Sequence, residues 1–111
     1  MGASTESPFE HRVVAALEVQ DHKQVTTLLK QWQASDAQNP LLRLYAATLQ
    51  EQTNRLEAAE KNYLKLLRQT SSSKLVSQAR AGIQRIHERQ KQQQQQQKVQ
   101  QALEKATALE Q

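Results

Sequence analysis

Residues 39–70 contain two successive helical patterns: NPLLRLYAATLQEQTNRLEAAEKNYLKLLRQT. Asn39-Pro40 is a helix cap followed by a first-turn proline, and apolar residues then recur at intervals of three and four. The same spacing restarts at Thr53-Asn54 with Glu57. The stretch therefore predicts an antiparallel helical hairpin. We expect its core to consist of Leu41, Leu42, Tyr45, Ala46, Leu49, Ala59, Tyr63 and Leu66.

Helical spacing extends to both sides of this hairpin. A capping box at residues 7–10 begins a helix over about 8–20, and a D-x-x-Q start at 21–24 begins another that breaks at 35–39. The serine run 71–73 separates a fifth helix. Only two Gly and two Pro are present, too few for the frequent turns of a β-sandwich or barrel. The predicted fold class is all-α, with two antiparallel helical hairpins plus a fifth helix.

The two hairpins are related by a shift of 31 residues. This shift places Val14-Ala15-Ala16 on Tyr45-Ala46-Ala47. It also places Val25 on Leu56, Leu28 on Ala59 and Trp32 on Tyr63. Trp32 therefore has two readings, a core residue between hairpins or a partly exposed anchor for a partner. Self-similarity at a period in the thirties is typical of helical solenoids.

In these residues the sequence resembles the tetratricopeptide-repeat (TPR) family. Tyr45-Ala46-x-x-Leu49 is similar to the large–small–large run of the family's first helix, and Ala59-x-x-x-Tyr63-x-x-Leu66 to its second helix. The resemblance covers residues 8–88, although Leu28 replaces the small residue expected in the first copy. Residues 56–68, followed by 77–83, also resemble small TPR-like proteins of cyanobacteria.

The resemblance implies a non-catalytic scaffold that binds an extended peptide or a helix of another protein on its concave face, as an adaptor or assembly module. The pattern of the family's carboxylate clamp is not matched, so binding of chaperone tails is not expected. The candidate partner-binding residues are Arg12, Arg43, Tyr45 and Gln50, together with Arg80, Arg85 and Arg89 of the basic fifth helix.

Catalytic and metal chemistry find little support in the sequence. Cysteine is absent, and none of the three histidines has a second histidine at metal-ligating spacing. Glu57 and Glu60 share a helix face with nearby lysines, which favours a salt-bridged surface over acid–base catalysis. We expect no enzyme activity, no metal and no cofactor.

The net charge of +4 lies entirely after Ser71. Residues 74–98 hold six basic side chains and one acidic one. This stretch leaves a nucleic-acid-binding accessory protein open as an alternative, although it contains no aromatic residue for base stacking. No stretch approaches the ~20 apolar residues of a membrane span, and the N-terminus lacks signal-peptide features. We therefore expect a cytoplasmic protein without membrane insertion.

Both ends of the chain are predicted to lie outside the helical domain, which spans residues 8–88. Residues 1–7 are predicted as a disordered tail, 89–98 as a Gln-rich spacer and 99–111 as a short amphipathic helical tail. The tail repeats apolar residues at Val99, Ala102, Leu103, Ala106 and Leu109. The spacer has two readings, helix or coil. A self-associating structural protein is a third alternative, and the oligomeric state stays open.

Overall fold

The computed structural model describes residues 8–110, with side chains described for 8–106. The predicted tail 1–7, the cap at Ser7 and the side chain of Leu109 lie outside the described parts. The described chain is helical, without strands, which confirms the all-α prediction. Its helices are α1 (Pro8–Glu18), α2 (His22–Ser35), α3 (Pro40–Gln52), α4 (Leu56–Gln69) and α5 (Ser73–Glu110).

Most helix starts follow the predicted caps. The Asp21 carboxylate accepts a hydrogen bond from the amide of Gln24 at 3.2 Å, and the Asn39 side chain accepts one from the amide of Leu41 at 2.9 Å. The prediction that the fourth helix restarts at Thr53-Asn54 is wrong by two residues. Thr53 instead ends α3 by donating its amide to the carbonyl of Leu49, and Asn54 has a φ of 61°. This left-handed residue reverses the chain before α4 begins.

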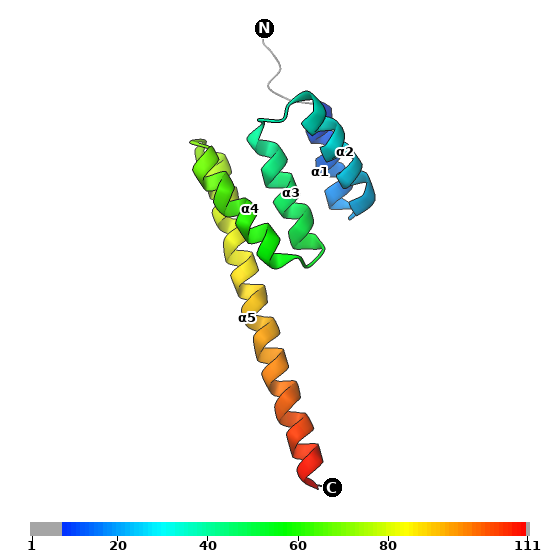
Figure 1. The fold of residues 1–111 in the computed structure, drawn as a ribbon, viewed down its shortest axis with the longest axis vertical. Helices are drawn as coiled ribbons and strands as arrows, with labels where there is room; N and C mark the ends of the chain where they lie inside the picture. Colours follow the sequence, from blue (N-terminus) through cyan, green and yellow to red (C-terminus); the bar gives the residue numbers. More distant parts are fainter. Residues whose placement is uncertain (1–7, 111) are drawn as a thin grey trace.

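Consecutive helices pack as antiparallel pairs. Figure 1 shows α1 beside α2, α3 beside α4, and the first half of α5 against α4. The second half of α5 then projects beyond the other four helices as a long extension (Figure 1). Helix α5 has no break between the predicted spacer and tail, so the helical reading of residues 89–98 is confirmed.

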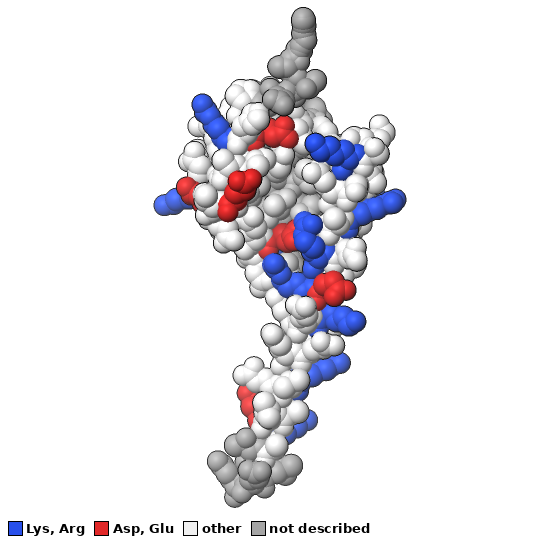
Figure 2. All heavy atoms as spheres, turned by 180° about the vertical axis from the view of Figure 1, so that it is seen from behind, with Lys and Arg blue, Asp and Glu red and all other residues white. Residues whose placement is uncertain are grey.

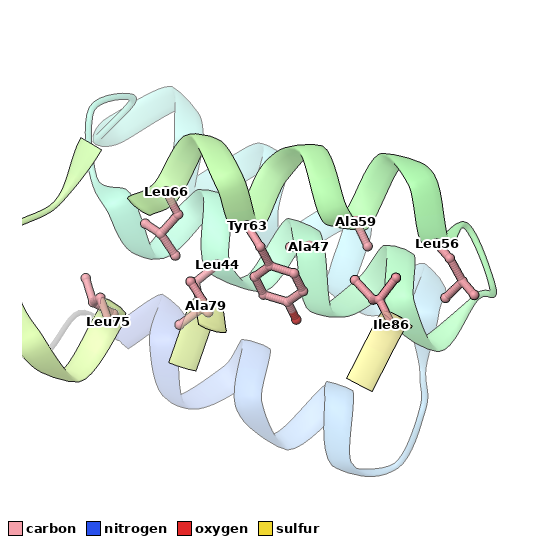
Figure 3. Close-up of a cluster of buried hydrophobic side chains, with 9 residues drawn as sticks. All are labelled: Leu44, Ala47, Leu56, Ala59, Tyr63, Leu66, Leu75, Ala79 and Ile86. Carbon is pink, nitrogen blue, oxygen red and sulfur yellow. The ribbon is translucent and has the colours of Figure 1, made fainter. Parts of the chain in front are cut away.

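Two hydrophobic clusters hold the helices together. One joins α1, α2 and α3 around Trp32, which is 1% exposed. The other joins α3, α4 and α5 around Tyr63, which is completely buried (Figure 3). Gly82 of α5 lies against the face of the Tyr63 ring, so α5 approaches α4 closely at this point. Trp32 is therefore a core residue, and the alternative of an exposed anchor is wrong.

The predicted core of α4 is confirmed, whereas that of α3 needs correction. Ala59, Tyr63 and Leu66 are buried, as is Leu49 of α3. Four other predicted core residues of α3 are only partly buried, because α3 turns Leu44 and Ala47 toward α4 and α5 instead. These four are Leu41, Leu42, Tyr45 and Ala46.

The internal repeat is visible in the burial of equivalent residues. In the second helices, all three pairs matched by the 31-residue shift consist of two buried side chains, whereas in the first helices only the pair Ala16 and Ala47 does. Helices α1 and α3 also run in parallel, because the Tyr45 hydroxyl bonds Glu10 and the Gln52 amide bonds the carbonyl of Leu17. The two hairpins thus stand side by side, and α5 takes the place of the next first helix.

Candidate partner-binding groove

The first helices of the successive pairs, α1, α3 and α5, form one continuous face, which we call the groove face. Figure 2 views the molecule from this side. The Tyr45 hydroxyl donates to the Glu10 carboxylate at 2.7 Å and ties α3 to α1. Two further contacts tie α3 to α5, both made by Glu51. The three helices are therefore held at a fixed spacing.

Glu51 is the centre of the polar contacts between α3 and α5. The residue is only 8% exposed. Its carboxylate accepts hydrogen bonds from Arg85, from Nε at 2.8 Å and from Nη2 at 3.0 Å. The Tyr63 hydroxyl donates to the same carboxylate at 2.8 Å. Arg89 donates from Nη1 to the Glu51 backbone carbonyl at 2.9 Å. Two arginines of α5 are thus anchored on one residue of α3.

This arrangement fixes the charge state of Glu51. Burial by itself raises the pKa of the carboxyl group. The hydrogen bonds from Arg85 and Tyr63, and the positive charges of Arg85 and Arg89, outweigh burial and hold the pKa below its ordinary value. Burial and the Glu51 carboxylate raise the pKa of Tyr63 to about 12, so its hydroxyl stays a donor at neutral pH. The cluster is a stable ion pair, without a group poised for proton transfer.

A pocket of about 200 Å³ opens on the groove face between α3 and α5. Its α3 side consists of Leu44 and the hydroxyl-bearing Tyr45 and Thr48, and its α5 side carries the amide of Gln78 and the guanidinium of Arg85. The lining residues, here called the groove pocket, are Leu44, Tyr45, Thr48, Tyr63, Gln78, Ala81 and Arg85. A shallower hollow of about 480 Å³ continues from it along α5, past Ala81 and Arg89 to Gln92. The two share Ala81 and Arg85 and therefore form one elongated depression.

Tyr45 forms one wall of the groove pocket and is backed by other aromatic rings. Its ring lies 6.1 Å from that of Trp32, which stacks on Phe9 at 6.2 Å. Burial and the adjacent Glu10 raise the pKa of Tyr45. The wall is therefore rigid, because moving Tyr45 would disturb the core between α1 and α2.

The candidate residues predicted from the sequence divide between two faces. Tyr45 and Arg85 line the groove pocket, and Arg89 lines its continuation. Arg43 and Gln50 instead hydrogen-bond Asn62 of α4, at 3.1 and 2.7 Å. The structure therefore does not bring these two together with Tyr45 in one groove, because they lie two and five positions from it and point about 160° and about 140° away around the helix. The remaining two candidates, Arg12 and Arg80, are exposed on α1 and α5.

The sequence reading missed Glu51, the residue that organises the groove face. Its partner Arg85 lies 34 residues away, and no local pattern links them. One signal was available. Leu44, Ala47 and Glu51 follow the spacing of a buried helix face, so a carboxylate stands where an apolar residue is expected.

Two of the histidines, and Glu60 of the predicted carboxylate pair, make contacts between helices. His87 bonds the Glu60 carboxylate at 2.5 Å, joining α5 to α4, and His22 bonds the Gln52 side chain at 3.1 Å. Within residues 8–106 there is no group of three side chains suited to hold a metal ion. Among the described helices, none is both long and apolar enough to cross a membrane.

Comparison with known proteins adds no family to this description. No protein-family model, curated protein or solved structure matches the chain.

Proposed function

We propose that the protein is a non-catalytic, TPR-like protein-interaction module that acts in the cytoplasm as an adaptor or assembly scaffold. In this proposal the groove face binds an extended peptide or a helix of another protein. The observation that carries it is the groove pocket, a depression between parallel first helices with a rigid aromatic wall and an arginine at its rim.

The order of the helices supports this reading. Glu10 of α1 and Tyr45 of α3 are in contact at a separation of 35 residues. Glu51 and Arg85 make the same kind of contact between α3 and α5 at a separation of 34. TPR repeats are 34 residues long. We interpret the chain as two repeats followed by the first helix of a third, although its own internal shift is 31 residues.

The chemistry of the pocket indicates what part of a partner would enter it. Tyr45 and Leu44 offer apolar surface, while Thr48 and Gln78 offer hydrogen-bonding groups. Arg85 uses Nε and Nη2 on Glu51, and its side chain is 55% exposed. We expect a partner segment with an apolar side chain in the pocket and backbone carbonyls along α5.

A pair of tryptophan variants tests this proposal. Ala81 is an exposed residue that lines both the pocket and its continuation, so Ala81→Trp fills the groove without disturbing the core. Leu64→Trp places the same side chain on the exposed side of α4. The immobilised full chain is exposed to lysate of the source organism and washed at low and high salt. We expect a set of proteins that wild type and Leu64→Trp retain at high salt and Ala81→Trp loses.

The Ala81→Trp variant can also refute the proposal. If Ala81→Trp retains the same proteins as wild type, the groove face is not the binding surface. A matching thermal stability of the two variants, measured beforehand, ensures that the loss reflects a blocked groove rather than unfolding.

The second candidate function is nucleic-acid binding by the basic side of α5. Figure 2 shows Lys and Arg side chains along one edge of this helix. In its sequence, Arg80, Lys91 and Lys98 recur at intervals of 11 and 7 residues. However, Arg85 and Arg89 are engaged with Glu51, which removes two of the six basic residues from this set. Four remaining charges would give a slope of log affinity against log salt of about −3.6 on duplex DNA. Titration of a DNA duplex at several salt concentrations measures this slope, and no binding at low salt would rule the candidate out.

A further inference from the structure

The groove pocket has room for one ring-sized side chain of a partner. Its volume is about 200 Å³. A protein cavity of about 150 Å³ is large enough to bind a benzene molecule. The pocket can therefore take a single side chain from a segment that lies in the groove, up to the size of a phenyl or phenol ring.

One wall of this pocket is an aromatic surface that is fixed in place. Tyr45 is only partly buried, and its hydroxyl donates to Glu10 at 2.7 Å. Its ring lies 6.1 Å from that of Trp32, which belongs to the core between α1, α2 and α3. Aromatic pairs prefer ring separations of about 4.5–7 Å, in stacked or edge-to-face arrangements. A second ring in the pocket would pack against Tyr45 in this way without moving it.

The α5 side of the pocket presents a guanidinium group. Arg85 donates to Glu51 from Nε and Nη2, so these hydrogen bonds lie in the guanidinium plane and leave the two faces of that plane for stacking. The side chain of Arg85 is 55% exposed, whereas that of Glu51 is 10% exposed. None of the described residues that line the groove pocket carries a carboxylate. The accessible charge of the pocket is therefore positive.

Charge complementarity distinguishes an aromatic side chain from an aliphatic one at this position. The face of an aromatic ring carries partial negative charge and attracts a cation. An aliphatic side chain of similar size would displace water from the Arg85 guanidinium and the Gln78 amide without offering either group a partner, which costs free energy. The pocket therefore favours a ring.

We propose that the groove pocket binds the aromatic side chain of a phenylalanine or tyrosine of the partner protein, packed between the Tyr45 ring and the Arg85 guanidinium. This inference rests on the proposed function, because it names the residue by which a bound segment is anchored in the groove. The rest of the segment lies along α5, in the shallower hollow that continues past Arg89.

Phenol and cyclohexanol form a matched pair of probes for this site. They share a six-membered ring and a hydroxyl group and differ in the π system. The full chain, labelled with nitrogen-15, is titrated with each compound while the backbone amide signals of Thr48, Gln78 and Ala81 are followed by NMR. Since a cation–π contact at an accessible site contributes a modest gain, we expect phenol to bind about two- to fivefold more tightly than cyclohexanol.

Three variants locate the response. Ala81→Trp should abolish the phenol response of Thr48 and Gln78, and Leu64→Trp should leave it unchanged. Arg85→Lys keeps a cation for Glu51 but removes the flat group on which a ring stacks, so the preference for phenol should shrink. An unchanged preference in Arg85→Lys would overturn the stacking on Arg85.

The wild-type titration also separates this inference from the proposed function. Cyclohexanol binding as tightly as phenol, or more tightly, would overturn the aromatic anchor. No response of the three amide signals to either compound would overturn it as well. In both cases the groove face remains the proposed binding surface as long as Ala81→Trp loses the proteins that wild type retains from lysate.

Discussion

Replacing Gly82 by alanine is expected to destabilise the protein, although the same change in an ordinary helix interior stabilises it by about 1 kcal/mol. A β-carbon at residue 82 would lie 2.4 Å from Cζ, 2.5 Å from Cε2 and 2.9 Å from Cε1 of Tyr63. Carbon atoms in contact prefer a separation of ~3.5–4.0 Å. Helix α5 and the tyrosine ring must therefore separate by about 1 Å.

The tyrosine ring has no low-energy way to make room. It is completely buried, and its hydroxyl donates to Glu51. Overpacking a core costs about 1–3 kcal/mol, and weakening a hydrogen bond to a charged group costs about 1.5–3 kcal/mol. After the gain in helix propensity, we expect a net loss of about 2–4 kcal/mol. For a domain of this size the melting temperature falls by about 10 °C or more.

Thermal and urea unfolding, followed by helical circular dichroism, measure this loss. Gln84→Ala is the control, because Gln84 is exposed on the same helix and its replacement should change stability by less than ~0.5 kcal/mol. A Gly82→Ala variant as stable as wild type, or more stable, would refute the close approach of α5 to Tyr63.

Three more predictions concern the core and the ion pair. Because the folded pKa of Glu51 lies below its ordinary value, its contribution to stability is present above about pH 4.3 and is lost as the pH falls through the folded pKa; urea unfolding from pH 7 to pH 3 should show a loss that Glu51→Gln reduces. Trp32→Ala removes a buried indole and should cost about 3–5 kcal/mol by urea unfolding, and an unchanged midpoint would contradict the core placement. Ala59→Leu should overpack the completely buried contact of α4 and cost about 1–3 kcal/mol, so an undiminished melting temperature would show that α4 packs less closely than described.

Much of the fold follows from sequence because helical periodicity is a local property. Trp32 and Tyr63, related by the internal repeat, are both core residues as their spacing predicts. The buried face of α3 was harder to predict from the sequence, because nearly all its residues from Leu41 to Leu49 are apolar or small. Such a helix has several candidate faces, and packing against α4 and α5 decides among them.

The candidate site was less predictable for a related reason. Groove residues were assigned by helix and charge, which identified Tyr45 and Arg85 but also included Arg43, whose side chain hydrogen-bonds to α4. Which side of a helix lines a groove depends on contacts between segments about 34 residues apart. The pairing of Glu51 with Arg85 is such a contact.

Hydrogen–deuterium exchange tests the proposed groove most directly. The full chain is measured alone and with a partner whose capture is sensitive to Ala81→Trp. We expect slower exchange in residues 44–52 of α3 and 78–92 of α5, with the exposed side of α4 at 61–68 unchanged. Protection confined to α4, or to residues 91–106 of the extension, would contradict the assignment of the groove face as the binding surface.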